Sequence, residues 1–247
     1  MTRISTLAAA ALLFTATMPM TACGQTQGSA PAAGATAATA NVDSLIPRAD
    51  RGRMKGAEGA QVTIIEVSDF QCPYCRDFAQ NTFARVDSAY VQTGKARVIY
   101  INLPLSMHRE AYGAAEAAMC ASAQGKFWQM HDRLFATQRE WGNQPDAAQR
   151  FERMAQEIRL DMAAFRDCTA NDRPASIIVN DAMQAAEAGI RGTPAFILNG
   201  PAGQRALSGA VPFEQFQAEM DALLAGQPSP TQPQQGPAQQ PQGQTPR

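Results

Sequence analysis

Two cysteines three positions apart, Cys72 and Cys75, directly follow an apolar segment, and this junction constrains the fold more than any other feature. Residues 61–68 form a near-continuous apolar run, which is typical of a strand buried on both faces of a sheet. Pro73 suits the first position of a helix, where its missing N–H would have no partner anyway. The sequence therefore predicts a strand, a Cys-x-x-Cys turn and a helix in that order.

This placement gives the two thiols different chemistry. Cys72 is expected at the helix N-terminus, where free backbone N–H groups and the positive end of the helix dipole favour a thiolate. Cys75 lies one turn further along, and residues so spaced have Cβ atoms about 5 to 6 Å apart, close enough for a disulfide. We predict Cys72 as the nucleophile and Cys75 as the buried, protonated thiol that resolves a mixed disulfide.

A zinc half-site and a purely structural disulfide are the alternatives for such a pair. Zinc needs a second pair of ligands at comparable spacing. The other candidates, His108, His131, Cys120 and Cys168, stand alone in the sequence. We therefore expect no metal, and a capping or packing role for each histidine.

Glu66 interrupts the apolar run six residues before Cys72. A buried carboxylate costs free energy unless it is paired or its pKa rises until it takes a proton. The functional interpretation is a buried proton shuttle that accepts the proton of Cys75 when that thiol attacks. The alternative is an edge position with Glu66 directed to water.

The overall charge excludes one class of function. The chain of 247 residues has a formal net charge of −1 and a pI of about 6.1, and its Lys and Arg residues are scattered. Nucleic-acid binding needs a basic surplus, so we expect no nucleic-acid partner.

The N-terminus indicates export. Arg3 precedes an apolar stretch at residues 7–14, which is too short for a good membrane span. Small residues directly before Cys23 resemble a bacterial lipoprotein signal, in which that cysteine is acylated and tethers the protein to a membrane. Gly24 after it favours the outer membrane in a Gram-negative cell. The alternative is ordinary cleavage near Ala22 with a spare thiol.

Two further cysteines, Cys120 and Cys168, lie in a region of helical periodicity. An exported chain enters an oxidising compartment, where two leftover cysteines are more often a structural disulfide than free thiols. We predict that they are bridged. Two separate buried thiols acting as small apolar residues are the alternative.

Four motifs together resemble a known family. They are the cysteine motif at 72–75, the preceding residues 68–71, the segment 124–128 within a helical block, and Gly192-Thr193-Pro194 opening a strand. With a closing hairpin and helix, this order is similar to the DsbA-like branch of the thioredoxin superfamily. The resemblance covers about residues 56–225.

The resemblance implies roles for particular positions. Thr193 and Pro194 match the family's cis-proline site, where the backbone beside Cys72 pairs with an extended substrate segment. Glu66 matches the family's buried acid. Pro73 and Tyr74, between the cysteines, complete the expected substrate contact.

Tyr74 departs from the histidine of the strongest oxidants in this group. Loss of that donor predicts a less stabilised thiolate and a less oxidising disulfide, which leaves the direction of electron flow open.

We predict an α/β fold: a thioredoxin-like core interrupted by a helical insertion domain. The predicted segments are a signal peptide at 1–22, a flexible tether at 23–41, an N-terminal arm at 42–58, the first core part at 59–107, a helical insertion at 108–189, the second core part at 190–226 and a disordered Gln/Pro-rich tail at 227–247.

The predicted function is thiol-disulfide exchange on cysteines of exported proteins, in the dithiol-oxidising direction, through a Cys72–Cys75 disulfide and without another cofactor. The alternatives are a reductase or isomerase using the same pair, a non-catalytic peptide-binding module or chaperone, and a metal carrier. We expect a monomer on the periplasmic or extracytoplasmic side, held by a lipid anchor. The resemblance implies a membrane quinone-linked reoxidant.

Overall fold

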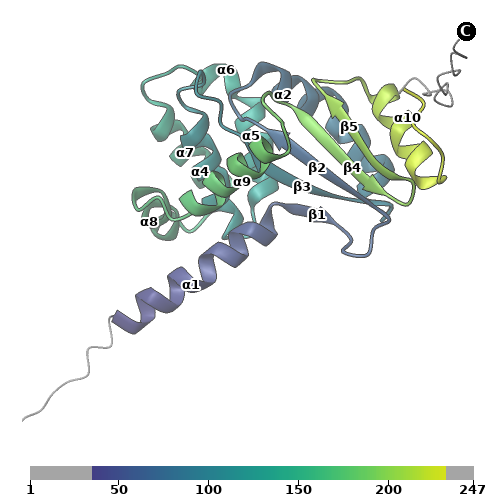
Figure 1. Ribbon diagram of the computed structural model, residues 1–247. Helices are drawn as coiled ribbons and strands as arrows, with labels where there is room; N and C mark the ends of the chain where they lie inside the picture. Colours follow the sequence, from purple (N-terminus) through teal and green to yellow (C-terminus); the bar gives the residue numbers. More distant parts are fainter. Residues whose placement is uncertain (1–34, 232–247) are drawn as a thin grey trace, which may run out of the picture.

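The computed structural model describes residues 35–231, with side chains from residue 44 onward (Figure 1). The predicted signal peptide, Cys23, Gly24 and the tail from residue 232 lie outside the described residues. Among the helices of residues 35–231, none is both long enough and apolar enough to cross a bilayer.

The first helix, α1 (Ala35–Gly52), differs from the expected tether to residue 41 and irregular arm. Residues 35–40 are Ala and Thr only, and alanine is the best helix former. Further along, Ile46 packs against the core of the helical block, and Ser122 Oγ donates a hydrogen bond to the Ala49 carbonyl oxygen over 2.5 Å. Helix propensity and tertiary contacts together order this segment, whose early part projects from the body (Figure 1).

Five strands form one mixed sheet in the order β1-β3-β2-β4-β5. β2 pairs parallel with β3 by a crossover through the helix that follows the cysteines, and the other pairings are antiparallel. The strands are β1 (Met54–Gly56), β2 (Val62–Ser68), β3 (Ala96–Asn102), β4 (Ala195–Gly200) and β5 (Gly203–Ser208).

The short strand β1 has too few residues for a recognisable sequence pattern, and we did not predict it. It pairs antiparallel with β3, Met54 opposite Ile99. Just before it, the buried Arg53 forms an ion pair with Asp181 of α9 (Ala175–Glu187), which is also buried. The same carboxylate accepts hydrogen bonds from the backbone and side chain of Asn102. A buried pair of opposite charges therefore ties the start of the sheet to α9.

The helix after the cysteines covers one face of the sheet together with α10 (Phe213–Leu224). The ring of Phe78 lies 4.4 Å from that of Phe196 and 5.8 Å from that of Phe216, so the helix, β4 and α10 share one core. Two π-helical segments alternate with α-helical ones, a detail absent from the prediction. The consecutive segments are α2 (Pro73–Phe78), η1 (Ala79–Phe83), α3 (Ala84–Val86) and η2 (Asp87–Val91).

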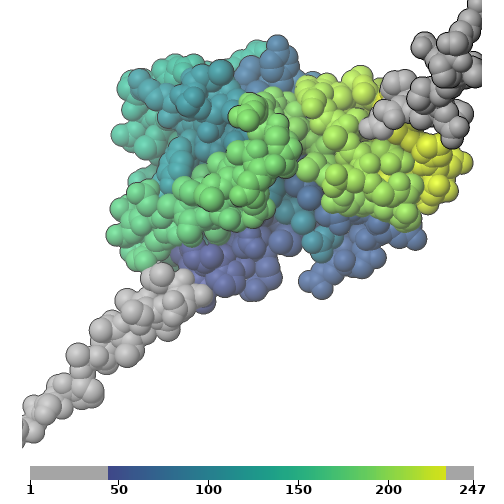
Figure 2. Space-filling view, viewed as in Figure 1, coloured from purple at the N-terminus to yellow at the C-terminus, as the bar shows by residue number. Residues whose placement is uncertain are grey.

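A block of helices lies between β3 and β4 in the chain and extends beyond one end of the sheet (Figure 1). Its last helix, α9, crosses the sheet face opposite α10 and forms much of the surface in Figure 2. The predicted domain boundaries at 107/108 and 189/190 stay predictions. The other helices of the block are α4 (Ala111–Ser122), α5 (Phe127–Ala136), α6 (Gln138–Trp141), α7 (Ala147–Glu157) and α8 (Met162–Ala170).

A disulfide joins α4 to α8 within this block. The Sγ atoms of Cys120 and Cys168 are 1.99 Å apart, and the bond closes a sequence separation of 48 residues. Both side chains are buried.

Candidate active site

The other two cysteines among the described residues, Cys72 and Cys75, lie at the junction between β2 and α2. Cys72 is the N-cap of α2, with extended backbone angles (φ −68°, ψ 125°), and Pro73 occupies the first helical turn. Both thiols are reduced; Cys75 is fully buried and Cys72 retains 3% exposure. The local geometry is therefore the one that the Cys-Pro pair predicts, with an outer and an inner sulfur on one helical turn.

Their environments separate the pKa values of the two thiols. The pKa of Cys72 is lowered to about 6, chiefly by the hydrogen bond from the Cys75 thiol and less by Thr193 and the amides of Tyr74 and Cys75. The pKa of Cys75 is raised well above its ordinary value, chiefly by burial and then by its contact with Cys72. The neighbouring thiol therefore contributes more to the low pKa of Cys72 than the backbone amides of the helix N-terminus, on which the sequence-based prediction relied.

The strand end opposite the cysteines carries a cis peptide bond between Thr193 and Pro194. The Cys72 Sγ lies 3.4 Å from the Thr193 carbonyl oxygen, and the Pro194 carbonyl accepts the N–H of Gly209 over 2.8 Å. A pocket of about 330 Å³ adjoins this bond, lined by residues 189–195 with Ser208 and Gly209. The pocket therefore adjoins Thr193, whose carbonyl oxygen contacts the outer sulfur.

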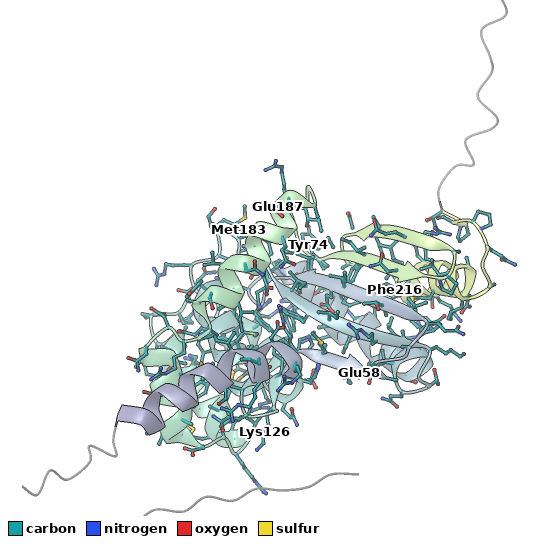
Figure 3. All side chains as sticks on the ribbon, turned by 60° about the horizontal axis from the view of Figure 1, so that its bottom comes forward. Glu58, Tyr74, Lys126, Met183, Glu187 and Phe216 are labelled. Carbon is teal, nitrogen blue, oxygen red and sulfur yellow. A yellow bond between two sulfur atoms is a disulfide. The ribbon has the colours of Figure 1, made fainter. Side chains whose placement is uncertain are left out.

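Tyr74 extends from α2 into solvent and is 64% exposed. In Figure 3 it is labelled close to Met183 and Glu187 of α9 and further from Phe216 of α10. Its ring is thus available to a bound protein segment, while its backbone amide serves Cys72.

Glu66 lies inside the protein with 1% exposure, which removes the alternative of an edge position directed to water. Burial raises the pKa of Glu66 to about 8, and the Ser68 side chain acts weakly in the opposite direction. The neighbouring Tyr100 has its pKa raised by burial first and then by the charges of Glu66 and Cys75, so these groups are electrostatically coupled. The raised pKa favours the protonated form of Glu66 at neutral pH, on a strand position directly opposite Tyr100.

The turn before Cys72 is held by residues that the sequence analysis did not assign to the site. Gln138 of α6 donates from Nε2 to the carbonyl oxygens of Phe70 and Cys72, at 2.7 and 2.9 Å. Glu110 holds the side chain of Gln71 through two hydrogen bonds, at 2.8 and 3.1 Å. These partners lie 39 to 68 positions away in the chain, so no local pattern points to them.

The two histidines differ in their surroundings. His108 approaches Asp69, with Nδ1 2.7 Å from Oδ2. His131 is 1% exposed among aromatic rings, with Phe135 at 4.9 Å, and burial lowers its pKa. His131 therefore has a packing role, while His108 contacts Asp69 in the active-site turn.

Within the described part of the chain, no group of three or more His, Cys, Asp and Glu side chains is placed to hold a metal ion. Cys120 and Cys168 are consumed in their disulfide.

A mixed sheet with a reduced Cys-x-x-Cys at a helix N-terminus, facing a cis-proline, is the arrangement of proteins whose two cysteines alternate between a dithiol and a disulfide. Comparison with known proteins narrows it: the family model described as Thioredoxin matches residues 48–222. The chain belongs to the thioredoxin family.

Solved structures share the fold. Wolbachia pipientis alpha-DsbA1 aligns with a TM-score of 0.62 and 23% identity over 70% of this chain and 90% of that one. BdbD from Bacillus subtilis, in its oxidised form, aligns with a TM-score of 0.59 and 19% identity over 71% and 94%.

Curated relatives are of two kinds. The probable disulfide bond formation protein D of Bacillus anthracis is 24% identical over 148 residues, covering 59% of this chain and 68% of that protein. The Na(+)/H(+) antiporter NhaA 3 of Salinispora tropica is 37% identical over 177 residues, covering 69% of this chain. This chain spans about a quarter (26%) of the antiporter's length.

Proposed function

We propose that the protein catalyses thiol-disulfide exchange on exported proteins and that it works in the dithiol-oxidising direction. The observation that carries the proposal is the paired arrangement of Cys72, with a pKa of about 6, over the buried Cys75, whose pKa is raised. A low-pKa outer sulfur is both a good nucleophile and a good leaving group. The open pocket beside Pro194 supplies room for the substrate.

In the oxidising reaction, a substrate thiolate attacks Sγ of Cys72 in the Cys72–Cys75 disulfide. A new S–S bond forms to the substrate as the internal one breaks, and Cys75 leaves with the electron pair. Glu66, protonated at neutral pH, supplies a proton to Cys75. A second substrate thiolate then attacks the substrate sulfur of the mixed disulfide and releases the Cys72 thiolate. The substrate loses two electrons, the enzyme gains them, and Glu66 regains a proton from solvent.

The same steps reversed make a reductase or isomerase, and the site bears on this choice. Tyr74 leaves its ring in solvent and adds only a backbone amide to the stabilisation of Cys72. A thiolate pKa of about 6 lies between those of the strongest oxidants, roughly 3.5, and of thioredoxin, roughly 7. These features favour an oxidant milder than the strongest members of the group.

An equilibrium titration of the Cys72–Cys75 couple against glutathione tests the direction. A potential near about −120 mV supports an oxidase and one near about −270 mV a reductase. Cys72→Ser is the matched variant, because it keeps the fold and the pocket but removes the attacking sulfur. If Cys72→Ser still suppresses aggregation of an unfolded client as well as the parent does, the chaperone alternative replaces the oxidoreductase.

We place the protein outside the cytoplasm, tethered by lipid on Cys23, with a membrane quinone-linked protein as its reoxidant. The likeness to a segment of proteins named as Na(+)/H(+) antiporters supports a working position at a membrane. Fractionation of cells that express the parent or Cys23→Ala tests the tether: the parent should pellet with membranes and the variant should not. Recovery of the parent entirely in the soluble fraction contradicts it.

A further inference from the structure

The carboxylate of Asp69 is fully buried between β2 and the active-site turn. Its Oδ1 accepts the backbone N–H of Gln71 at 2.7 Å, and its Oδ2 accepts the backbone N–H of Leu105 at 2.9 Å. The third partner is His108, whose Nδ1 lies 2.7 Å from Oδ2. A buried carboxylate is costly unless its oxygens are satisfied, so all three contacts matter to the position of this residue.

Asp69 also reaches the redox pair through its own backbone. Its N–H donates to Sγ of Cys75 over 3.5 Å. The N–H of Cys72, in turn, donates to the carbonyl oxygen of Asp69 at 3.0 Å. One residue therefore contacts both cysteines through its main chain and is fixed by its side chain.

Of the three groups that hold the Asp69 carboxylate, only His108 is a side chain. It comes from the loop between β3 and α4, 39 positions away, and its ring is 17% exposed. We propose that His108 is a positioning residue for the redox pair: by holding Asp69, it stabilises the dithiol form relative to the disulfide. The inference rests on the proposed exchange function and adds a residue to it.

The charges in the site determine which redox form His108 stabilises. The dithiol form carries the Cys72 thiolate, so it depends most on correctly placed donors and on the absence of nearby uncompensated negative charge. Without the imidazole donor, Asp69 is a buried carboxylate with two partners instead of three, and its N–H is less firmly aimed at Cys75. Both effects destabilise the dithiol form and make the disulfide harder to reduce.

The test is the equilibrium constant for reduction of the Cys72–Cys75 disulfide by glutathione, measured on purified parent, His108→Leu, His108→Asn and Arg166→Gln. His108→Leu removes the donor, and the constant should fall at least about fivefold, as for the loss of a hydrogen bond to a charged group. His108→Asn keeps a side-chain N–H and should restore the constant to within about twofold. Arg166, 54% exposed on its side chain, contacts Glu152 and no residue of the active-site turn, so Arg166→Gln is the control and should leave the constant unchanged.

A pH titration of thiolate absorbance on the same reduced proteins gives a second readout, in which His108→Leu should titrate Cys72 at higher pH than the parent. Equal constants and equal titrations in parent and His108→Leu overturn the inference while leaving the exchange function intact. If the parent itself does not exchange with glutathione, the proposed function fails instead. A fall in His108→Asn equal to that in His108→Leu also overturns the inference, because the donor would then be irrelevant.

Discussion

The side-chain Nε2 of Gln138 lies 2.9 Å from the carbonyl oxygen of Cys72, so a helix of the inserted block is hydrogen-bonded to the reactive cysteine itself. The same amide also reaches the carbonyl oxygen of Phe70. The catalytic turn is therefore held between the sheet that carries it and the helices that follow β3.

Replacing Gln138 by Ala should destabilise the protein and loosen this turn. The change removes a donor from the carbonyl oxygens of Phe70 and Cys72, of which Cys72 keeps the N–H of Arg76, and an unsatisfied buried group costs roughly 1 to 3 kcal/mol. Urea unfolding of the dithiol form measures the loss. Gln156→Ala, at an exposed position on α7, is the control and should change the unfolding free energy by less than about 0.5 kcal/mol. Equal urea midpoints for Gln138→Ala and Gln156→Ala would show that the hydrogen bonds of Gln138 contribute nothing to stability.

Removing the inner thiol should raise the pKa of the outer one. Because the hydrogen bond from Cys75 is the largest cause of the low Cys72 pKa of about 6, Cys75→Ala should move the thiolate titration of Cys72 upward. Cys75→Ser keeps a donor and should move it less. The rate of iodoacetamide alkylation as a function of pH gives both values. An unchanged titration in Cys75→Ala would assign the effect to the helix N-terminus instead.

Glu66 should make stability depend on pH. Its pKa is about 8 in the folded state and 4.5 ordinarily. A carboxyl whose folded pKa is raised contributes stability that is fully present below about 4.5 and is lost as pH rises to about 8. In Glu66→Gln, which carries no charge at any pH, the fall in unfolding free energy between pH 5 and pH 8 should be smaller.

The control for that experiment is Glu58→Gln, an exposed carboxylate in the loop after β1. Some dependence should persist in Glu66→Gln, because burial and the neighbouring Asp172 raise the pKa of Glu116 to about 8 as well. Identical pH profiles for parent and Glu66→Gln would contradict the buried-acid assignment.

The disulfide between α4 and α8 should support stability without taking part in exchange. The double change Cys120→Ala and Cys168→Ala opens a loop of 48 residues, for which chain-entropy arguments give a loss of about 4 kcal/mol. Guanidinium unfolding measures that loss. Exchange with glutathione at 25 °C should keep its equilibrium constant in the folded fraction. A shifted constant would mean that the bond communicates with Cys72.

Local patterns were enough for much of the fold. The apolar run with its Cys-Pro junction predicted β2 and the start of α2, and the closing hairpin expected after Pro194 corresponds to β4 and β5. The burial of Glu66 was one of two interpretations that the sequence left open, and only the placement of β2 between β3 and β4 decides between them. Side chains of successive strand residues point to opposite faces, and Glu66 and Val67 are both buried, so the sheet is covered on both faces at this point.

The remaining parts depend on contacts that no local pattern carries. β1 has three residues and gains its order from β3. Two hydrogen bonds hold the active-site turn: Gln138 contacts Cys72, 66 positions away, and His108 contacts Asp69, 39 positions away. Polar residues in loops satisfy many possible partners, so their roles appear only when the three-dimensional neighbours are known.

The buried ion pair between Arg53 and Asp181 limits where a truncated form of the protein can begin. A truncated protein that begins at β1 lacks Arg53 and leaves the buried carboxylate of Asp181 without its ion-pair partner. Such a loss typically costs about 3 to 5 kcal/mol of stability. A soluble fragment should therefore start upstream of Asp50, which also contacts Arg53.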